Sequence, residues 1–355
     1  MAPRSADELR SYGVMDPHLK DMLESHPLPN PAPGSDFFAR REHRAAMLRE
    51  KHHLRYILGP IPEVAEHDRK ISVRDGSEIT VRIYEPVQSA GHGESRPLVV
   101  MYHEGGWSMG DLSDEETNCR LFTRDLGAVC VNVEYRLAPE HKFPTGINDC
   151  WDALKWAAKN AASLGANPRL GFIIGGGSAG GNIAAILAHL ARDNKLDPPL
   201  TGQYLCVPAI TCFMPPEDMP EQYRAEYLSH PSITPSIDPV LRPDGRNPRA
   251  MLKLLGADPN SPLFVPFLYR DAPGGHKGLP PAYFQVCGLD PLRDEALIYE
   301  RILREESGVK TRLDIYPGLG HYFWTNFPLL DVSKRFVEDS LKGVQWLLEQ
   351  SSHDS

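Results

Sequence analysis

Short apolar runs alternate with helix-like stretches over most of this sequence, and this alternation constrains the fold more than any other feature. The runs are PLVVMYH (97–103), AVCVNVEY (128–135), LGFIIGG (170–176), TGQYLCVPAI (201–210), AYFQVCG (282–288) and TRLDIYPG (311–318). Helix-like stretches lie near residues 115–126, 147–164, 179–193, 292–307 and 331–350. Continuous apolar strands of this kind are buried on both faces, so the pattern predicts an α/β fold with a mostly parallel central sheet flanked by helices.

Three further segments complete the expected domain organisation. KISVRDGSEITVRIYEP (70–86) reads as two alternating strands around a DG turn, which predicts a β-hairpin. Residues 1–65 are rich in charge, proline and histidine and contain two helix-like pieces. Residues 212–275 are too many for a connecting loop and too rich in aromatics and Met for disorder. We therefore expect a core of residues 66–211 and 276–355, with the other two segments forming a helical cap over the carboxyl ends of the strands.

The composition excludes some classes of function. The formal net charge of −9 argues against a surface for nucleic acid or anionic membranes, which would need clustered Lys and Arg. The start of the chain lacks the apolar core of a secretory signal, and no apolar run is long enough to span a bilayer. The six cysteines include no C-x-x-C pair, so neither a zinc site nor a disulfide framework is indicated. We expect a cytoplasmic protein with reduced thiols.

The glycine-rich stretch IIGGGSAGGNIAA (173–185) surrounds one serine, Ser178, between an apolar run and a helix-like stretch. A flexible glycine loop and a phosphate-binding turn are two alternatives. No G-x-G-x-x-G opens the first strand–helix unit, however, and no Lys follows as in a phosphate-binding loop. The strand–turn–helix context is that of a G-x-S-x-G nucleophile elbow, in which small neighbours are needed around a strained serine. The stretch therefore predicts that Ser178 is a catalytic nucleophile.

A nucleophilic serine needs a base, and the base needs an acid that orients it. Asp290 follows one late apolar run, and His321 follows the next, in the chain order of α/β hydrolases. Taken alone, Asp290 is an N-cap for the next helix, and His321 is a histidine packed among aromatics. Their joint order and placement after Ser178 favour a catalytic triad. Asp294 is a second acid in the same DPLRDE stretch, but it lies one helical turn further from the strand end.

An oxyanion hole is expected beside the first predicted strand of the parallel series. Gly105 and Gly106 follow that strand in the stretch HEGGW, and adjacent glycines let backbone N–H groups turn inward. The N–H of Ala179, next to the nucleophile, completes the predicted set of donors. The alternative is an ordinary tight turn.

With these motifs in order, the chain resembles the hormone-sensitive-lipase-like esterase family of the α/β hydrolases. The matching stretches are HEGGW (103–107), YRLAPEHKFP (135–144), GGSAGG (176–181), DPLRDE (290–295) and GHYF (320–323). The resemblance covers roughly residues 65–350 and implies the α/β-hydrolase fold, a helical cap and carboxylic-ester hydrolysis. It also implies the same roles for the triad and for the three oxyanion donors.

Two positions depart from the family pattern. The family usually has HGGG, and here the second position is Glu104; it usually has Asp before the nucleophile, and here that residue is Gly177. A carboxylate facing the oxyanion would oppose its charge. We therefore expect Glu104 to pair with a nearby cation or, as the alternative, to meet a polar part of the substrate. Arg136 and Glu140 are expected to hold the loop beside the hole.

The predicted function is a serine carboxylic-ester hydrolase that forms an acyl-enzyme and needs no cofactor or metal. The expected partner is a small to medium, largely apolar ester, as in secondary metabolism, and neither nucleic acid nor a membrane span is involved. Substrate contacts are expected from a set of apolar and aromatic side chains: Trp107, Phe213, Met214 and Tyr322. Acyl transfer, dehydration or cyclisation on the same triad is an alternative, as is a non-catalytic small-molecule receptor. A homodimer is left open.

Overall fold

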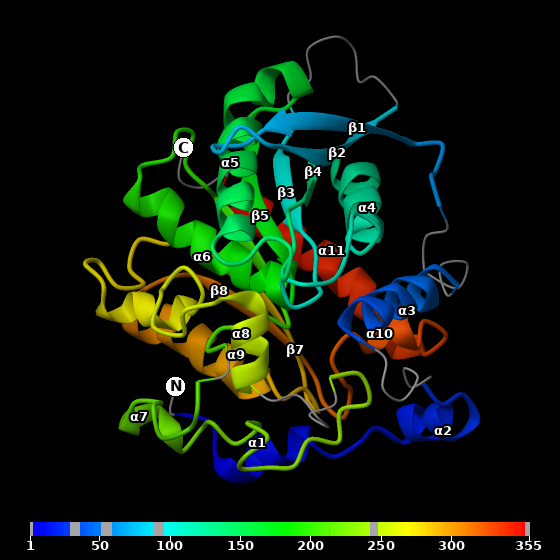
Figure 1. The fold of residues 1–355 in the computed structure, drawn as a ribbon, viewed down its shortest axis with the longest axis vertical. Coiled ribbons are helices and arrows are strands. Elements are labelled where there is room, and N and C mark those ends of the chain that lie inside the picture. The colour runs from blue at the N-terminus through cyan, green and yellow to red at the C-terminus, as the bar shows by residue number, and fades with distance from the viewer. Residues whose placement is uncertain are drawn as a thin grey trace.

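The computed structural model describes residues 3–28, 36–50, 59–87, 96–212, 214–241 and 248–351. An eight-stranded sheet with the order β1-β2-β4-β3-β5-β6-β7-β8 runs through the molecule (Figure 1). The strands are β1 (Val64–Ser72), β2 (Glu78–Pro86), β3 (Leu98–Tyr102), β4 (Val129–Glu134), β5 (Phe172–Gly177), β6 (Gly202–Cys206), β7 (Ala282–Cys287) and β8 (Thr311–Tyr316). The six apolar runs of the sequence form β3 to β8, and neighbours among these strands pair in parallel. The predicted mostly parallel sheet is confirmed.

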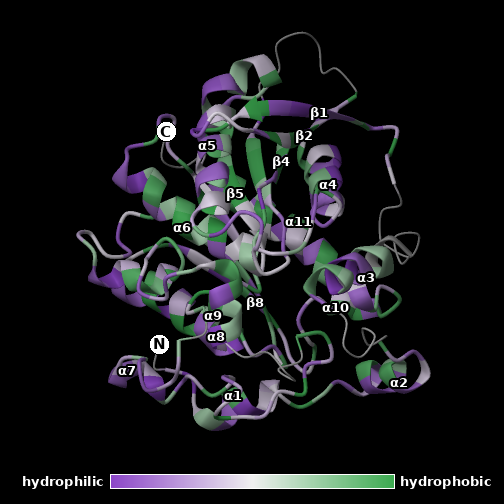
Figure 2. Cartoon of the chain, in the orientation of Figure 1, coloured by the Kyte–Doolittle hydropathy of each residue, from purple (hydrophilic) through white to green (hydrophobic). Residues whose placement is uncertain are grey.

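The predicted hairpin forms the antiparallel edge of the sheet. β1 pairs with β2, and β2 pairs with β4, both antiparallel. At the turn, Gly76 has a φ of +84°, and the Asp75 carboxylate accepts a hydrogen bond from the Ser77 N–H at 3.0 Å. Edge strands face water, which explains why β1 is largely hydrophilic (Figure 2), whereas every residue of β3 and β5 is buried.

Helices cover both faces of the sheet. α5 (Thr145–Asn160), α6 (Ala179–Asp193) and α9 (Arg293–Arg301) pack on one face. α4 (Glu116–Leu126) and α11 (Asp331–Ser351) pack on the other. Two apolar cores result, and alternate residues of each strand enter alternate cores. The shorter elements are η2 (Ala161–Leu164), η3 (Pro168–Leu170), η5 (Ile302–Glu306) and α10 (Phe323–Asn326).

In the described part of the chain before β1, there are three helices. α2 (Pro17–Ser25) and α3 (Phe37–Glu50) correspond to the two predicted pieces, and α1 (Ala6–Tyr12) was not expected from the sequence. The end of α1 and the linker after it lie against the loop that follows β8, because Gly318 donates its N–H to the Tyr12 carbonyl at 2.8 Å and accepts the N–H of Asp16 at 3.0 Å. Leu9 and Leu19 are buried, so α1 and α2 are anchored on the body of the protein.

The insertion between β6 and β7 has less helix than its length predicts. In its described part, the helical elements are α7 (Glu221–Arg224), α8 (Pro248–Leu255) and the 3-10 helix η4 (Pro266–Asp271). Prolines recur through this segment, and each removes a backbone donor and restricts the residue before it, so turns replace longer helices. Within the described residues, no helix combines the length and apolar character needed to cross a bilayer.

Candidate active site

The glycine-rich turn places Ser178 between β5 and α6. Ser178 has a φ of 53° and a ψ of −111°, a backbone conformation that L-residues rarely adopt. A Cβ atom at Gly176 or Gly180 would overlap the carbonyl oxygen of Tyr102 on β3. The glycines therefore let the turn pass directly against the neighbouring strand, which is the purpose that the sequence predicted for them.

A continuous chain of hydrogen bonds joins the three predicted triad residues. His321 Nε2 lies 3.0 Å from Ser178 Oγ, and His321 Nδ1 lies 2.6 Å from Asp290 Oδ2. The other carboxylate oxygen of Asp290 accepts the N–H of Leu292 at 2.8 Å. Asp290 thus caps the following turn and contacts the histidine at once. The three side chains lie as acyl transfer would require of a nucleophile, a base and an acid.

The environment of His321 favours its protonated form. Burial acts to lower the pKa of His321, but the charge and hydrogen bond of Asp290, with the charges of Asp238 and Glu104, outweigh it. The pKa is therefore raised above its ordinary value. A base of this kind accepts a proton from a serine more readily, and it loses its function as the pH falls through that pKa.

The other acids of the DPLRDE stretch contact the insertion rather than the histidine. Asp294 Oδ2 accepts the Leu228 N–H at 2.7 Å and also accepts the Ser229 N–H. Glu295 Oε1 accepts the Ile210 N–H at 2.6 Å. The structure therefore brings Asp290, and not Asp294, to His321.

The loop after β3 carries the predicted oxyanion donors. Gly105 and Gly106 have φ angles of +114° and +59°, and a Cβ at Gly105 would overlap the Met109 carbonyl. Among the described residues, none accepts a hydrogen bond from the N–H of Gly105 or Gly106. The loop itself is held by Tyr135, whose hydroxyl donates to the His103 carbonyl at 2.9 Å.

Glu104 pairs with a cation, which was the first of the two alternatives. Arg44 of α3 approaches Glu104 Oε1 to 2.6 Å and Asp114 Oδ1 to 3.5 Å. Burial raises the pKa of Glu104 to about 7, although Arg44 acts to lower it. A side-chain hydrogen bond with Tyr322 also acts to lower this pKa. The helix before the sheet therefore supplies the charge that balances a carboxylate next to the oxyanion loop.

A second arginine of α3 holds the loops on either side of the same site. Arg41 forms an ion pair with Glu140 at 2.6 Å and donates to the carbonyls of Ala138 at 2.6 Å and Ser108 at 2.8 Å. Glu140 thus fastens its loop through α3. Arg136 instead pairs with Asp149 of α5 at 2.7 Å. The sequence predicted that Arg136 and Glu140 hold this loop, and these contacts identify their partners as Asp149 and Arg41.

Gly177, the second departure from the family pattern, has a steric reason in this chain. A Cβ at residue 177 would overlap the hydroxyl group of Tyr322, which directly follows the predicted catalytic histidine. The Gly177 N–H is also within hydrogen-bonding reach of Glu115, a residue whose burial raises its pKa to about 8. Tyr322 is 5% exposed and therefore packs behind the nucleophile turn.

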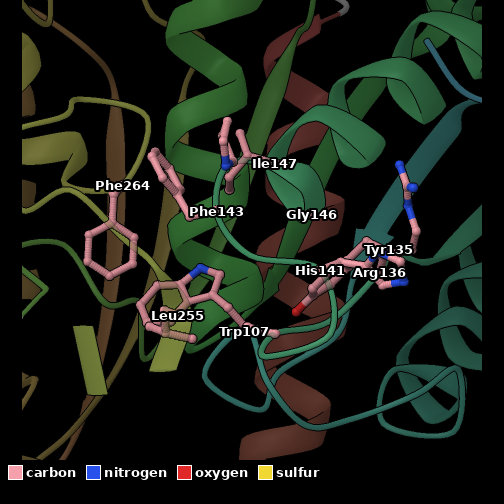
Figure 3. A pocket seen from close by; sticks show the side chains of 11 residues that line it. Trp107, Tyr135, Arg136, His141, Phe143, Gly146, Ile147, Leu255 and Phe264 are labelled. Carbon is pink, nitrogen blue, oxygen red and sulfur yellow. The ribbon is translucent and has the colours of Figure 1, made fainter. Parts of the chain in front are cut away.

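A small cavity lies beside Trp107, the residue that follows Gly105 and Gly106. Trp107 lines it together with Phe143, Leu255 and Phe264, and the Trp107 and Phe264 rings are 4.8 Å apart (Figure 3). Of the four predicted substrate contacts, Trp107 is the one that reaches this cavity. Met214 is partly buried at the edge of the core, and Phe213 lies outside the described residues.

Three residues near the site were not found from the sequence. Arg41 and Arg44 lie three positions apart, so they share one face of α3, and this spacing was a usable signal. Asp238 accepts the backbone N–H of His321 at 2.6 Å. Its stretch, SIDPV, resembles any Asp-Pro turn, and nothing in it points to a histidine 83 residues away.

The sheet order and the glycine turn are those of an α/β hydrolase. A family model described as "alpha/beta hydrolase fold" matches residues 99–325. The chain belongs to the hormone-sensitive-lipase-like esterase family within that fold.

Individual relatives agree with this assignment. An AB hydrolase superfamily protein of Schizosaccharomyces pombe is 40% identical over 345 residues, which are 95% of each chain. Versiconal hemiacetal acetate esterase of Dothistroma septosporum is 36% identical, covering 82% of this chain and 85% of its own. Carboxylesterase NlhH of Mycobacterium tuberculosis is 34% identical, covering 89% and 90%. This chain is accordingly an enzyme, a carboxylesterase-type hydrolase acting on ester bonds.

Among solved structures, that of a vibralactone cyclase is similar over 99% of each chain, with a TM-score of 0.87 and 33% sequence identity. Esterases and a cyclase thus share this architecture.

Proposed function

We propose that this chain hydrolyses carboxylic esters with Ser178 as nucleophile, His321 as general base and Asp290 as the orienting acid. Ser178 Oγ attacks the ester carbonyl while His321 Nε2 takes its proton. The tetrahedral intermediate then collapses, and the imidazolium returns the proton to the departing alcohol. Water attacks the acyl-enzyme by the same route and releases the acid. The observation that carries the proposal is the hydrogen-bond chain from Ser178 to Asp290.

The N–H groups of Gly105, Gly106 and Ala179 are proposed to stabilise the oxyanion. Two of them have no acceptor within the described residues, and the third begins a helix, where the backbone dipole is positive. One such donor contributes about 3 kcal/mol to transition-state stabilisation.

The proposed substrate is a small to medium, largely apolar ester. Support comes from the apolar surroundings of the proposed oxyanion loop, where the Trp107 ring packs against that of Phe264. The name of one relative, an esterase for versiconal hemiacetal acetate, favours a short acyl group in secondary metabolism. A cytoplasmic location and a homodimer stay predictions.

Cyclisation is the second candidate function, and one observation favours it: the similarity to a vibralactone cyclase along the whole chain. On the same acyl-enzyme, a hydroxyl group within the acyl chain would replace water, and His321 would take its proton. The bond to Ser178 Oγ would break as a lactone forms.

The test is turnover on a panel of p-nitrophenyl esters, with Ser178→Ala as control and an organophosphonate as a covalent label. We expect ester cleavage, labelling at Ser178, and a folded but inactive alanine variant. Labelling at another serine, or full activity in the variant, would refute the assignment. Mass analysis of products from ω-hydroxyacyl esters separates the candidates, since hydrolysis adds water to the acid and cyclisation does not.

A further inference from the structure

Asp238 belongs to the insertion between β6 and β7, and it is 2% exposed. Both of its carboxylate oxygens accept backbone N–H groups. Oδ1 accepts those of Val240 and Leu241, each at 2.7 Å, and Oδ2 accepts that of His321 at 2.6 Å. One carboxylate therefore fastens the insertion to the backbone of the residue that carries the proposed base.

The loop before the histidine is shaped for this contact. A Cβ atom at Gly320 would lie 3.0 Å from Asp238 Oδ2 and 2.8 Å from Cδ of Pro239. The first distance is tighter than ordinary van der Waals contact, and the second would require a shift. Glycine at position 320 thus lets the Asp238 carboxylate reach the backbone N–H of His321.

The charges around His321 come from three parts of the fold. Asp290 follows β7, Glu104 follows β3, and Asp238 is in the insertion; each acts to raise the pKa of the imidazole. Glu104 has Arg44 as its counter-charge. Within the described ranges, no Lys or Arg side chain forms an ion pair with Asp238. Within the described residues, the Asp238 carboxylate is thus met by backbone N–H groups and by the histidine. Burial and the charge of Asp290 raise the pKa of Asp238 to about 6, so the carboxylate carries its charge above that pH.

We infer that Asp238 is a positioning residue of the reaction. It fixes the backbone of His321 and places a second negative charge beside the imidazolium that forms when Ser178 is deprotonated. This role rests on the proposed function, in which His321 is the base. Asp238 exchanges no proton with the substrate. It acts through the histidine, and it makes the insertion part of the catalytic apparatus.

Asp238→Asn is the variant that tests this inference, because the amide keeps the shape and one accepting oxygen but loses the charge. We expect kcat/KM on a p-nitrophenyl ester to fall roughly tenfold at its plateau, the size of one lost charge-assisted hydrogen bond. We expect KM to change little. The acid limb of the pH profile should move to lower pH, because one of the carboxylates that raise the pKa of His321 is gone.

Asp271→Asn is the matched control, since the Asp271 carboxylate is in the same insertion and is 65% exposed. It should leave both the rate and the pH profile unchanged. A lower rate in Asp238→Asn with an unmoved acid limb overturns the electrostatic role, and a wild-type rate overturns the inference as a whole. Circular dichroism and phosphonate labelling confirm that each variant is folded. If Ser178→Ala and Asp290→Asn remain active, the proposed function fails instead.

Discussion

Besides Asp290, the buried carboxylates of Glu104 and Asp238 border the proposed active site, and their partners differ. On the oxyanion side, formed by the 103–114 loop and α3, Glu104 is paired with Arg44. On the histidine side, formed by the loops of Asp238, Asp290 and His321, the hydrogen-bond partners of the Asp238 carboxylate among the described residues are backbone N–H groups. During ester cleavage negative charge develops at the oxyanion and positive charge at the imidazole. A carboxylate without a counter-charge would therefore destabilise the transition state on the oxyanion side and stabilise it on the histidine side. In agreement with this, Glu104 is paired with an arginine.

The largest expected effect concerns the histidine side. Asp290→Asn should lower kcat about 10⁴-fold, because the imidazole would lose its orienting partner and adopt the wrong tautomer. Asp294→Asn is the matched comparison, since Asp294 holds the insertion at Leu228 and Ser229 instead. It should lower thermal stability while the rate per folded molecule stays near wild type. A severe rate loss in Asp294→Asn with a mild one in Asp290→Asn would reverse the assignment.

The next effect concerns the oxyanion side. Arg44→Met should lower the free energy of unfolding by about 3 kcal/mol, because it leaves two buried carboxylates, Glu104 and Asp114, without their cation. Urea denaturation at pH 8 measures this change. Adding Glu104→Gln to the same chain should recover part of the loss. Arg10→Met, at an arginine that is 67% exposed, serves as control and should stay within about 0.5 kcal/mol.

The pH dependence of stability probes the same carboxylate. The pKa of Glu104 in the folded chain is about 7, above its ordinary 4.5, so the protonated form stabilises the fold. This contribution is complete below pH 4.5 and is lost as the pH rises through 7. Relative to Glu104→Gln, the wild type should therefore lose roughly 2–3 kcal/mol between pH 4.5 and 8. Urea titrations of the two proteins at each pH measure this. The prediction is wrong if the free energy of unfolding of the wild type, minus that of Glu104→Gln, stays constant or rises with pH.

The smallest expected effect concerns the contact between Gly177 and Tyr322. Gly177→Ala should destabilise the fold by about 1–3 kcal/mol, because the new Cβ overlaps the Tyr322 hydroxyl. Tyr322→Phe in the same chain removes that hydroxyl and should restore part of the loss. Gly13→Ala is the control, since its nearest contacts would be at 3.4 Å. Equal melting temperatures for Gly177→Ala and wild type would show that the turn can move.

The sequence predicted those parts of the molecule that depend on local pattern. Strands β3 to β8 follow from continuous apolar runs, and the geometry at Ser178 follows from steric limits on its immediate neighbours. The order of Ser178, Asp290 and His321 was enough to name the residues that the fold brings together. The roles assigned to them, and to the oxyanion donors, stay predictions until the variants are measured.

What the sequence could not predict depends on contacts between distant segments. Asp238 and Arg44 are ordinary charged residues until the fold brings them to His321 and Glu104. The insertion was expected to be more helical than it is, because its aromatic content indicates burial but does not say which backbone conformation achieves it. The prolines of the insertion interrupt its helices, because each lacks a backbone N–H group.

The arginines of α3 have a consequence for biosynthesis. The acceptors of Arg44 and Arg41 include Glu104 and Glu140, which follow them by 60 and 99 residues. At about 5–20 residues per second, the ribosome needs several seconds or more to add those partners. A helix of 14 residues is marginal in water on its own, so we expect α3 to be largely unfolded until its partners have been added. The ion pairs of α3 can therefore form only after translation has passed residues 104 and 140. Slow translation of residues 50–140 would lengthen the time for which the unpaired arginines of α3 are exposed to cellular anions.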